Sequence, residues 1–273
     1  MKSLISVGIA AVVLVSIYAF FEYISKPNQD TKTVSKKVNA SPLLLDQDDA
    51  KTVLSKCMTA HGGKEALDRW HCGHVQYLAS GELFRTGQMK NVVFQDTFQF
   101  PDYFKRTVNF ELAGKPEEMT FVVNQQNKWV RNSGPSLKAL SSFQTSLQEH
   151  PLKVLIDFSF LSSVQPFLLA RLPNKVINHE ETADIIYKTD GLGVHFYFDL
   201  YTGLLLATSK AMPIENSAKT KLLMTSYDSY RDVQGYPFPM EISTKQDNHE
   251  ILTLKIRQLS FSDQYEASEF AKP

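Results

Sequence analysis

Few residues of this chain combine the side-chain types and the spacing that catalysis requires. Cys57 and His61 lie four positions apart in a segment with helical periodicity, so they would share one helix face, as an activated thiol and its base do. A histidine at the end of that helix would also cap its last carbonyl groups. Because both interpretations fit, we assign no catalytic residue and do not expect an enzyme.

Possible metal ligands occur in patterns that do not make a site. His71, Cys72 and His74 are nearly adjacent, but neighbouring side chains in a strand or turn point apart, and no second cluster supplies further ligands. His179 lacks the second histidine of the zinc-protease motif, because Ala183 stands at that position. No phosphate-binding loop or nucleophile elbow is present either. We therefore predict no metal and no other cofactor.

The elements that would position any site begin with an apolar segment. Leu4–Phe21 has no charge and no proline, and a helix needs roughly 20 apolar residues to cross a bilayer. A cleaved secretion signal is the alternative, but Phe20-Phe21-Glu22-Tyr23-Ile24 is bulky where a signal peptidase requires small residues. We predict a transmembrane anchor, or an uncleaved signal, over residues 1–25 and a flexible tether over residues 26–45.

Charge bears on both partners and orientation. The 273 residues include 29 basic and 29 acidic side chains, and this balance argues against nucleic acid as a partner. Lys26, Lys32, Lys36 and Lys37 follow the apolar segment whereas Lys2 precedes it, a bias that favours a cytoplasmic body. Large domains are nevertheless translocated despite such charges, so charge alone leaves the orientation open.

The body, residues 46–273, is expected to begin with helices. Asp46–Ala60 carries apolar residues at helical spacing, Asp46 or Asp49 can cap its start, and Gly62-Gly63 would end it. A further short helix is predicted over Lys64–Trp70. This helical segment precedes a long region of different periodicity.

After Gly73 the hydrophobic period becomes two, which is typical of half-buried antiparallel strands. A segment in the middle, Ser136–Leu172, lacks this alternation and is strongly apolar, so we predict one or two helices that end before Pro173. The fold class that follows is mainly β (α+β), with one strongly curved antiparallel sheet and a helical lid. The expected strands are Phe94–Phe100, Val108–Leu112, Met119–Trp129, Ile185–Lys188, Gly193–Leu200, Leu204–Met212, Lys221–Arg231, Met240–Lys245 and Ile251–Leu259.

Aromatic residues dominate the apolar positions of these strands. They would either pack a closed core or line an apolar cavity in an open, curled sheet, with the helical segment across its mouth. The candidate cavity residues are Phe94, Phe98, Phe110, Phe121, Trp129, Phe196 and Phe198 from the strands, and Leu155 and Phe158 from the helical segment.

Four motifs in order along the chain resemble those of a known family. They are Thr59–Leu67, Phe198–Leu205, Tyr227–Pro239 and Phe270–Pro273. Together they are similar to the bacterial outer-membrane lipoprotein-sorting superfamily, the LolA/LolB-like proteins. The resemblance implies a half-barrel closed by helices, a concave face that holds acyl chains, and no catalytic residue. It also implies an exported body, and hence an inner-membrane protein with a single pass and its body in the periplasm.

The chain departs from the family in its N-terminal segment, which we predict to be uncleaved and which contains no cysteine for lipidation. We therefore expect a membrane-anchored periplasmic binding protein for a lipid or lipid-like ligand rather than a lipoprotein-sorting factor. The alternative is a non-catalytic interaction domain with a filled core and an envelope protein as its partner. In an exported body, Cys57 and Cys72 are candidates for a disulfide, and two buried thiols are the alternative.

Overall fold

The computed structural model describes most of the body of the chain. It covers residues 41–72, 74–85, 88–99, 103–112, 114–124, 127–132, 161, 166–188, 193–213, 220–262 and 267–271. Among these residues, no helix has the length and the apolar character that crossing a membrane requires. The predicted anchor over residues 1–25 and the candidate cavity residues Leu155 and Phe158 lie outside the described residues.

Two helices open the described body. Helix α2 (Ala50–Ala60) begins at Asp49, whose side-chain oxygen accepts a hydrogen bond from the backbone N–H of Thr52 at 2.7 Å. Its end coincides with Gly62, which has a φ of 94° and leaves no room for a side chain, since a Cβ would lie 2.5 Å from the carbonyl oxygen of Gly235. Helix α3 (Gly63–Cys72) follows directly. Both predicted helices are therefore confirmed.

Twelve strands form one antiparallel sheet in the described part of the chain. Each strand predicted from residue 185 onward overlaps an observed one, with ends that differ by at most one residue for those that extend beyond it, because the alternation of buried and exposed side chains is a local signal. The strands are β1 (His74–Arg85), β2 (Gln88–Gln99), β3 (Tyr103–Leu112), β4 (Lys115–Asn124), β5 (Asn127–Asn132), β6 (Leu169–Ile177), β7 (Glu180–Tyr187), β8 (Val194–Asp199), β9 (Leu205–Pro213), β10 (Thr220–Val233), β11 (Tyr236–Gln246) and β12 (His249–Ser262).

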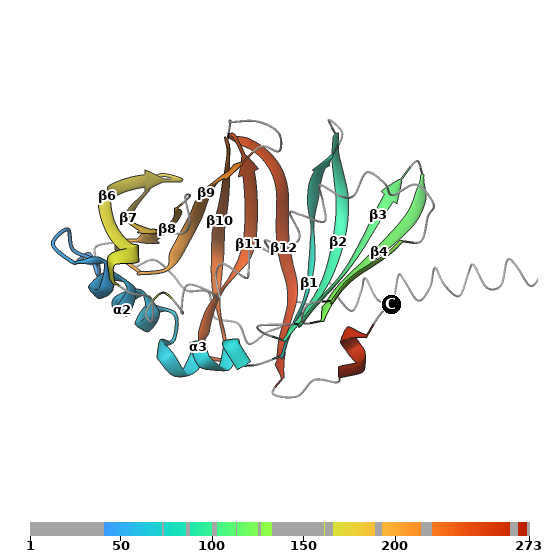
Figure 1. Cartoon of the computed structure of the whole chain (residues 1–273), viewed down its shortest axis with the longest axis horizontal. Coiled ribbons are helices and arrows are strands. Elements are labelled where there is room, and N and C mark those ends of the chain that lie inside the picture. The colour runs from blue at the N-terminus through green and yellow to red at the C-terminus, as the bar shows by residue number, and fades with distance from the viewer. Residues whose placement is uncertain are drawn as a thin grey trace, which may run out of the picture. The chain divides into compact units, whose positions relative to one another are not determined.

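The strand order is β5-β4-β3-β2-β1-β12-β11-β10-β9-β8-β7-β6, so two meanders join where β1 pairs with β12. The sheet is open: β5 and β6, which follow each other in the sequence, are its two edge strands. Figure 1 shows β6 at one end of the sheet and β4, the neighbour of β5, near the other. At the seam, Gly81 allows the two backbones to approach closely, because an added Cβ would lie 1.7 Å from the carbonyl oxygen of Thr253. A register shift between Leu78 and Ala79 accompanies this approach.

The structure corrects two boundaries. Leu169–Leu172, predicted as the end of a helix, belongs to strand β6, which continues through Pro173. An edge strand tolerates proline because the missing N–H can face away from the neighbouring strand. The row predicted over Met119–Trp129 is two strands, β4 and β5, which pair with each other. Met119, Phe121 and Trp129 share one parity in the sequence, and this concealed the boundary between β4 and β5.

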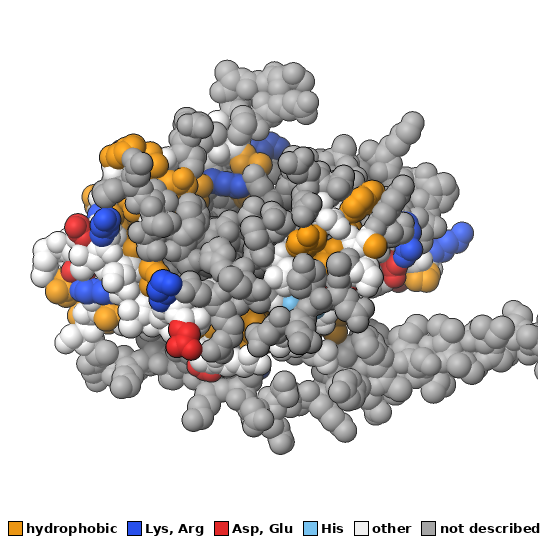
Figure 2. Space-filling view, turned by 60° about the horizontal axis from the view of Figure 1, so that its bottom comes forward, with side chains coloured by type: hydrophobic (Ala, Val, Ile, Leu, Met, Phe, Trp, Pro, Cys, Tyr) orange, Lys and Arg blue, Asp and Glu red, His pale blue; other side chains and the backbone are white. Residues whose placement is uncertain are grey.

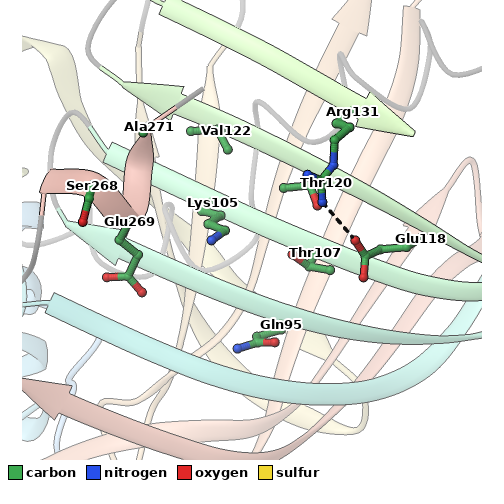
Figure 3. A pocket seen from close by; sticks show the side chains of 10 residues that line it. All are labelled: Gln95, Lys105, Thr107, Glu118, Thr120, Val122, Arg131, Ser268, Glu269 and Ala271. Atoms are coloured by element: carbon green, nitrogen blue, oxygen red, sulfur yellow. Dashed lines mark hydrogen bonds and ion pairs between the residues drawn. The ribbon is translucent and has the colours of Figure 1, made fainter. Parts of the chain in front are cut away.

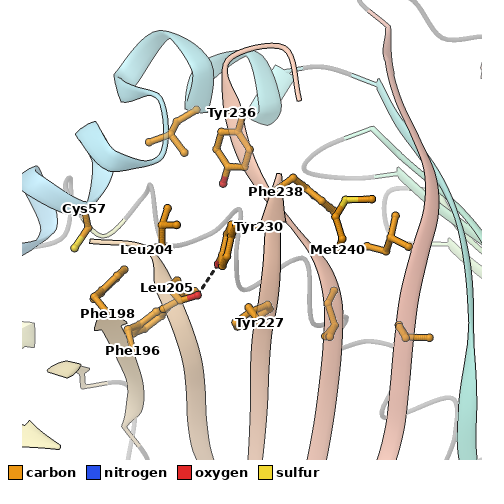
Figure 4. Packing of buried hydrophobic residues seen from close by; sticks show 14 of the residues in the cluster. Cys57, Phe196, Phe198, Leu204, Leu205, Tyr227, Tyr230, Tyr236, Phe238 and Met240 are labelled. Atoms are coloured by element: carbon orange, nitrogen blue, oxygen red, sulfur yellow. Dashed lines mark hydrogen bonds between the residues drawn. The ribbon is translucent and has the colours of Figure 1, made fainter. Parts of the chain in front are cut away.

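One hydrophobic cluster lies on a single face of the sheet, which we call the inner face. Helices α2 and α3 pack against the part formed by β8–β11, where Cys57 lies near Leu204 and Phe198 (Figure 4). Leu161, a described residue from the segment between the two edge strands, is fully buried in the same cluster. On the face shown in Figure 2, basic, acidic and hydrophobic described side chains are interspersed.

Candidate functional site

The structure brings most of the described candidate cavity residues into this cluster. Phe94, Phe98, Phe121, Phe196 and Phe198 are at most 3% exposed. Phe110 is partly buried and packs against them. Trp129 stands apart, because the register places it opposite Val122 rather than opposite Phe121, and thus on the outer face.

Three polar residues lie among these aromatic rings on the inner face. Tyr77 from β1, Asp96 from β2 and Arg106 from β3 are neighbours in the strand register. Arg106 donates from Nε to Asp96 Oδ1 at 2.7 Å and from Nη2 to Oδ2 at 2.5 Å, and Tyr77 also donates to Oδ2. All three side chains are at most 2% exposed. They form a bidentate ion pair with a bound phenol, which we call the inner-face triad.

Electrostatic interactions within the triad keep Arg106 and Tyr77 protonated. Burial lowers the pKa of Arg106, but the charge and the hydrogen bonds of Asp96 outweigh it and raise that pKa above its ordinary value. Burial, reinforced by the Asp96 carboxylate, raises the pKa of Tyr77. The Arg106 guanidinium lies 4.8 Å from the centre of the Phe94 ring and 5.4 Å from that of Phe104. Arg106 therefore stays charged in an aromatic environment.

Our sequence prediction missed this triad, although the sequence contains a signal for it. In β2, Asp96 lies between Phe94 and Phe98, and all three positions have the same parity. In β3, Arg106 follows Phe104 with the same spacing. Charged residues at the apolar positions of an alternating strand point inward, and their burial requires a partner.

The region under α2 is different in character. The ring of His61 lies within hydrogen-bonding distance of the Cys57 carbonyl oxygen, 2.8 Å from Nδ1, while Nε2 accepts the N–H of Leu205 at 3.4 Å. Burial lowers the pKa of His61 to about 4, so the ring is neutral. Burial also raises the pKa of the Cys57 thiol. The capping interpretation of His61 is thus confirmed, and the geometry gives no activated thiol.

The disulfide stays a prediction. Cys57 is a free, buried thiol, and the side chain of Cys72 lies outside the described residues. Within the described part of the chain, no three histidine, cysteine or acidic side chains gather in an arrangement that could hold a metal ion.

Proteins of the lipoprotein-sorting family are among the structural neighbours. An outer membrane lipoprotein-sorting protein domain from Vibrio parahaemolyticus superimposes with a TM-score of 0.45 and 11% identity, covering 81% of this chain and 95% of that one. A LolA superfamily protein from Nitrosomonas europaea superimposes with a TM-score of 0.46 and 11% identity, covering 74% of this chain and 91% of that one. A DUF1329 family protein from Desulfovibrio piger superimposes with a TM-score of 0.49 and 12% identity, covering 82% of this chain and 100% of that one.

The other comparisons find no relative. No model of a protein family matches the sequence, and no curated protein matches it. The likeness to solved structures at such identities concerns the fold alone, so the function has to be argued from the residues of this chain.

Proposed function

We propose that this chain is a membrane-anchored binding protein that holds a lipid, or another ligand with an apolar chain, against the inner face of a half-barrel. The N-terminal apolar segment would anchor it in the inner membrane, with the body in the periplasm. The segment between β5 and β6, which carries the buried Leu161, would act as the lid. No catalytic step is part of the proposal.

The observation that carries the proposal is the inner-face triad within its aromatic surroundings. Removing two charges from water costs several kcal/mol per ion, and an apolar replacement of similar volume is often as stable as a buried ion pair. A core selected for packing alone has little reason to retain Asp96 and Arg106. A face that receives a ligand with both an apolar chain and a polar group has use for both kinds of side chain.

Partly exposed residues extend this surface. Phe104 and Phe110 lie on either side of Arg106 in the inner-face row of β3, and neither is completely buried. An acyl chain laid on them would remove apolar area from water and gain about 25 cal/mol per Å² buried. The binding surface would thus run along β3, past Arg106.

A specific observation favours a second function. Five of the candidate cavity side chains are almost completely buried, which is what a filled core requires. In that case the chain would be a non-catalytic interaction domain, and its outer surface would meet an envelope protein.

Native mass spectrometry of the full chain, purified in mild detergent from its cell membranes, distinguishes the two functions. For the binding protein, we expect a bound mass that lipid extraction identifies as a fatty acid or a phospholipid. A bare protein mass, together with no uptake of an added fluorescent fatty acid, would reject the binding function and leave the interaction domain.

A further inference from the structure

A polar pocket lies on the outer face of the sheet. Its cavity volume is about 360 Å³, and strands β2–β5 form its floor. Its wall is the short helix η4 (Ala267–Phe270), near the C-terminus (Figure 3). The proposed function uses the opposite face of the sheet, so this pocket has no role in it.

The strand register builds the floor of the pocket. Gln95, Thr107, Thr120 and Arg131 are successive cross-strand partners on β2, β3, β4 and β5, so their side chains form one row across the sheet. Lys105 lies two residues before Thr107 and therefore points to the same face. In Figure 3 it lies between this row and η4.

The wall is anchored by the C-terminal segment. Phe270 is completely buried, with its ring centre 5.5 Å from that of Tyr103 and 6.3 Å from that of His74. Its carbonyl oxygen accepts a hydrogen bond from Asn124 at 3.2 Å. The pocket is therefore a packed feature of the fold rather than a gap beside a loose end.

Among the described residues, one basic side chain of the pocket contacts no carboxylate. Glu118 pairs with Arg131 at 3.5 Å. Glu269 accepts a hydrogen bond from Gln76 at 2.8 Å and lies 3.0 Å from Nε2 of His74. Lys105, by contrast, is partly buried and makes no hydrogen bond or ion pair within the part of the chain that the structure describes.

Neutral donors beside Lys105 are also unused. The side chains of Gln95, Thr107 and Thr120 make no hydrogen bond among the described residues, although Thr120 is only 4% exposed. Two hydroxyls, one amide and one ammonium thus converge on the same space. A tetrahedral oxyanion accepts several such bonds at once, and lysine binds phosphate as a point charge.

We propose that this outer-face pocket binds a phosphate group carried by a small polar molecule or by a lipid headgroup. Lys105 supplies the charge, and Thr107, Thr120 and Gln95 supply hydrogen bonds. The volume exceeds that of a phosphate ion and leaves space for a small polar substituent, within reach of the Glu118 and Glu269 carboxylates.

Calorimetric titration of the full chain in detergent tests the site, with inorganic phosphate and sn-glycerol 3-phosphate as soluble probes. We expect saturable one-to-one binding of glycerol 3-phosphate that weakens as salt increases. Lys105→Gln should weaken it at least tenfold, and Lys105→Arg should keep it. The matched control is Lys115→Gln, which removes the same charge from an exposed position at the start of β4, outside the pocket.

The outcomes are distinct. Mixed micelles that contain phosphatidylglycerol, compared with micelles of phosphatidylcholine, report whether the phosphate comes from a lipid headgroup. Binding of phosphatidylglycerol that depends on Lys105 assigns the phosphate to a lipid headgroup. Binding of glycerol 3-phosphate alone assigns it to a free metabolite. Equal binding by the Lys105→Gln and Lys115→Gln variants, or no saturable binding of any probe to the wild type, overturns the proposal. A failed lipid extraction in the mass-spectrometry experiment would leave it intact.

Discussion

Two regions of one inner face surround their aromatic side chains with different polar groups. Under α2, the polar groups that enter the core are neutral: His61 caps the helix, and Tyr230 donates to the Leu205 carbonyl at 2.5 Å. Over β1–β3, the polar groups are a carboxylate and a guanidinium, and the phenol of Tyr77 binds to them. The two regions belong to the same hydrophobic cluster.

The two kinds of polar group differ in what they contribute to stability. Neutral polar groups with one or two hydrogen bonds complete a core at little cost, since they satisfy backbone groups that would otherwise be buried unpaired. A buried ion pair gains little stability over apolar residues, although breaking it is costly. In the proposed function, the ligand would lie at the triad end of the inner face, and the region under α2 would be structural.

The largest expected effect concerns ligand uptake. Phe110→Asp introduces a charge beside the proposed acyl chain and should abolish lipid uptake, because desolvating an unpaired carboxylate is prohibitive. Lipid extracted per mole of full-length protein measures the effect. Val176→Asp is the matched control, since Val176 is 67% exposed in β6 and lies outside the proposed lid. A folded Phe110→Asp variant that still carries lipid would show that this surface is not the ligand site.

Breaking the triad should be the most destabilising change. Asp96→Ala leaves the Arg106 charge buried and unpaired, so we expect the free energy of unfolding to fall by about 3–5 kcal/mol. The double variant Asp96→Leu with Arg106→Met should recover most of that loss while its lipid binding weakens. Urea denaturation checks both variants. If Asp96→Ala lowers the free energy of unfolding by less than about 1 kcal/mol, the charged triad does not differ in stability from the neutral region under α2.

The region under α2 should instead carry a pH dependence. The pKa of His61 is about 4 in the folded chain and 6.5 in the unfolded chain, so the unfolded state binds more protons between these values. Above pH 6.5 the ring of His61 is neutral in both states and does not change the free energy of unfolding with pH. As the pH falls from 6.5 to 4, the ring becomes protonated in the unfolded state first, and the free energy of unfolding decreases by roughly 3 kcal/mol. Urea denaturation across this range measures the slope, which His61→Gln should reduce. An unchanged slope in that variant would assign the dependence to other groups.

The smallest effects compare two buried phenols. Tyr77→Phe removes a hydrogen bond to a charged group and should cost about 1.5–3 kcal/mol, whereas Tyr230→Phe removes one to a neutral carbonyl and should cost about 1 kcal/mol. Both substitutions delete one hydroxyl from a buried ring, so each controls for the other. Equal losses in urea denaturation would mean that the triad is no more strongly coupled than the neutral region.

Much of the fold could be read from local patterns. The period of two predicted the second meander, and Asp49 and Gly62-Gly63 bounded α2. The mistakes occurred where two structures share one pattern: the apolar residues before Pro173 suit an edge strand as well as a helix. Trp129 was assigned to the inner face because the turn between β4 and β5 shifts the parity of the alternation.

The sequence by itself determined most of the strands, the two helices α2 and α3 and, through alternation, that Asp96 and Arg106 share a face with the phenylalanines. These properties depend on neighbours only a few residues away. Only the tertiary structure decided that β1 pairs with β12, that Tyr77 meets Asp96, and that η4 closes a pocket over Lys105. Such contacts join segments that are far apart in the sequence. They form only when the packing of the whole chain compensates for the entropic cost of loop closure.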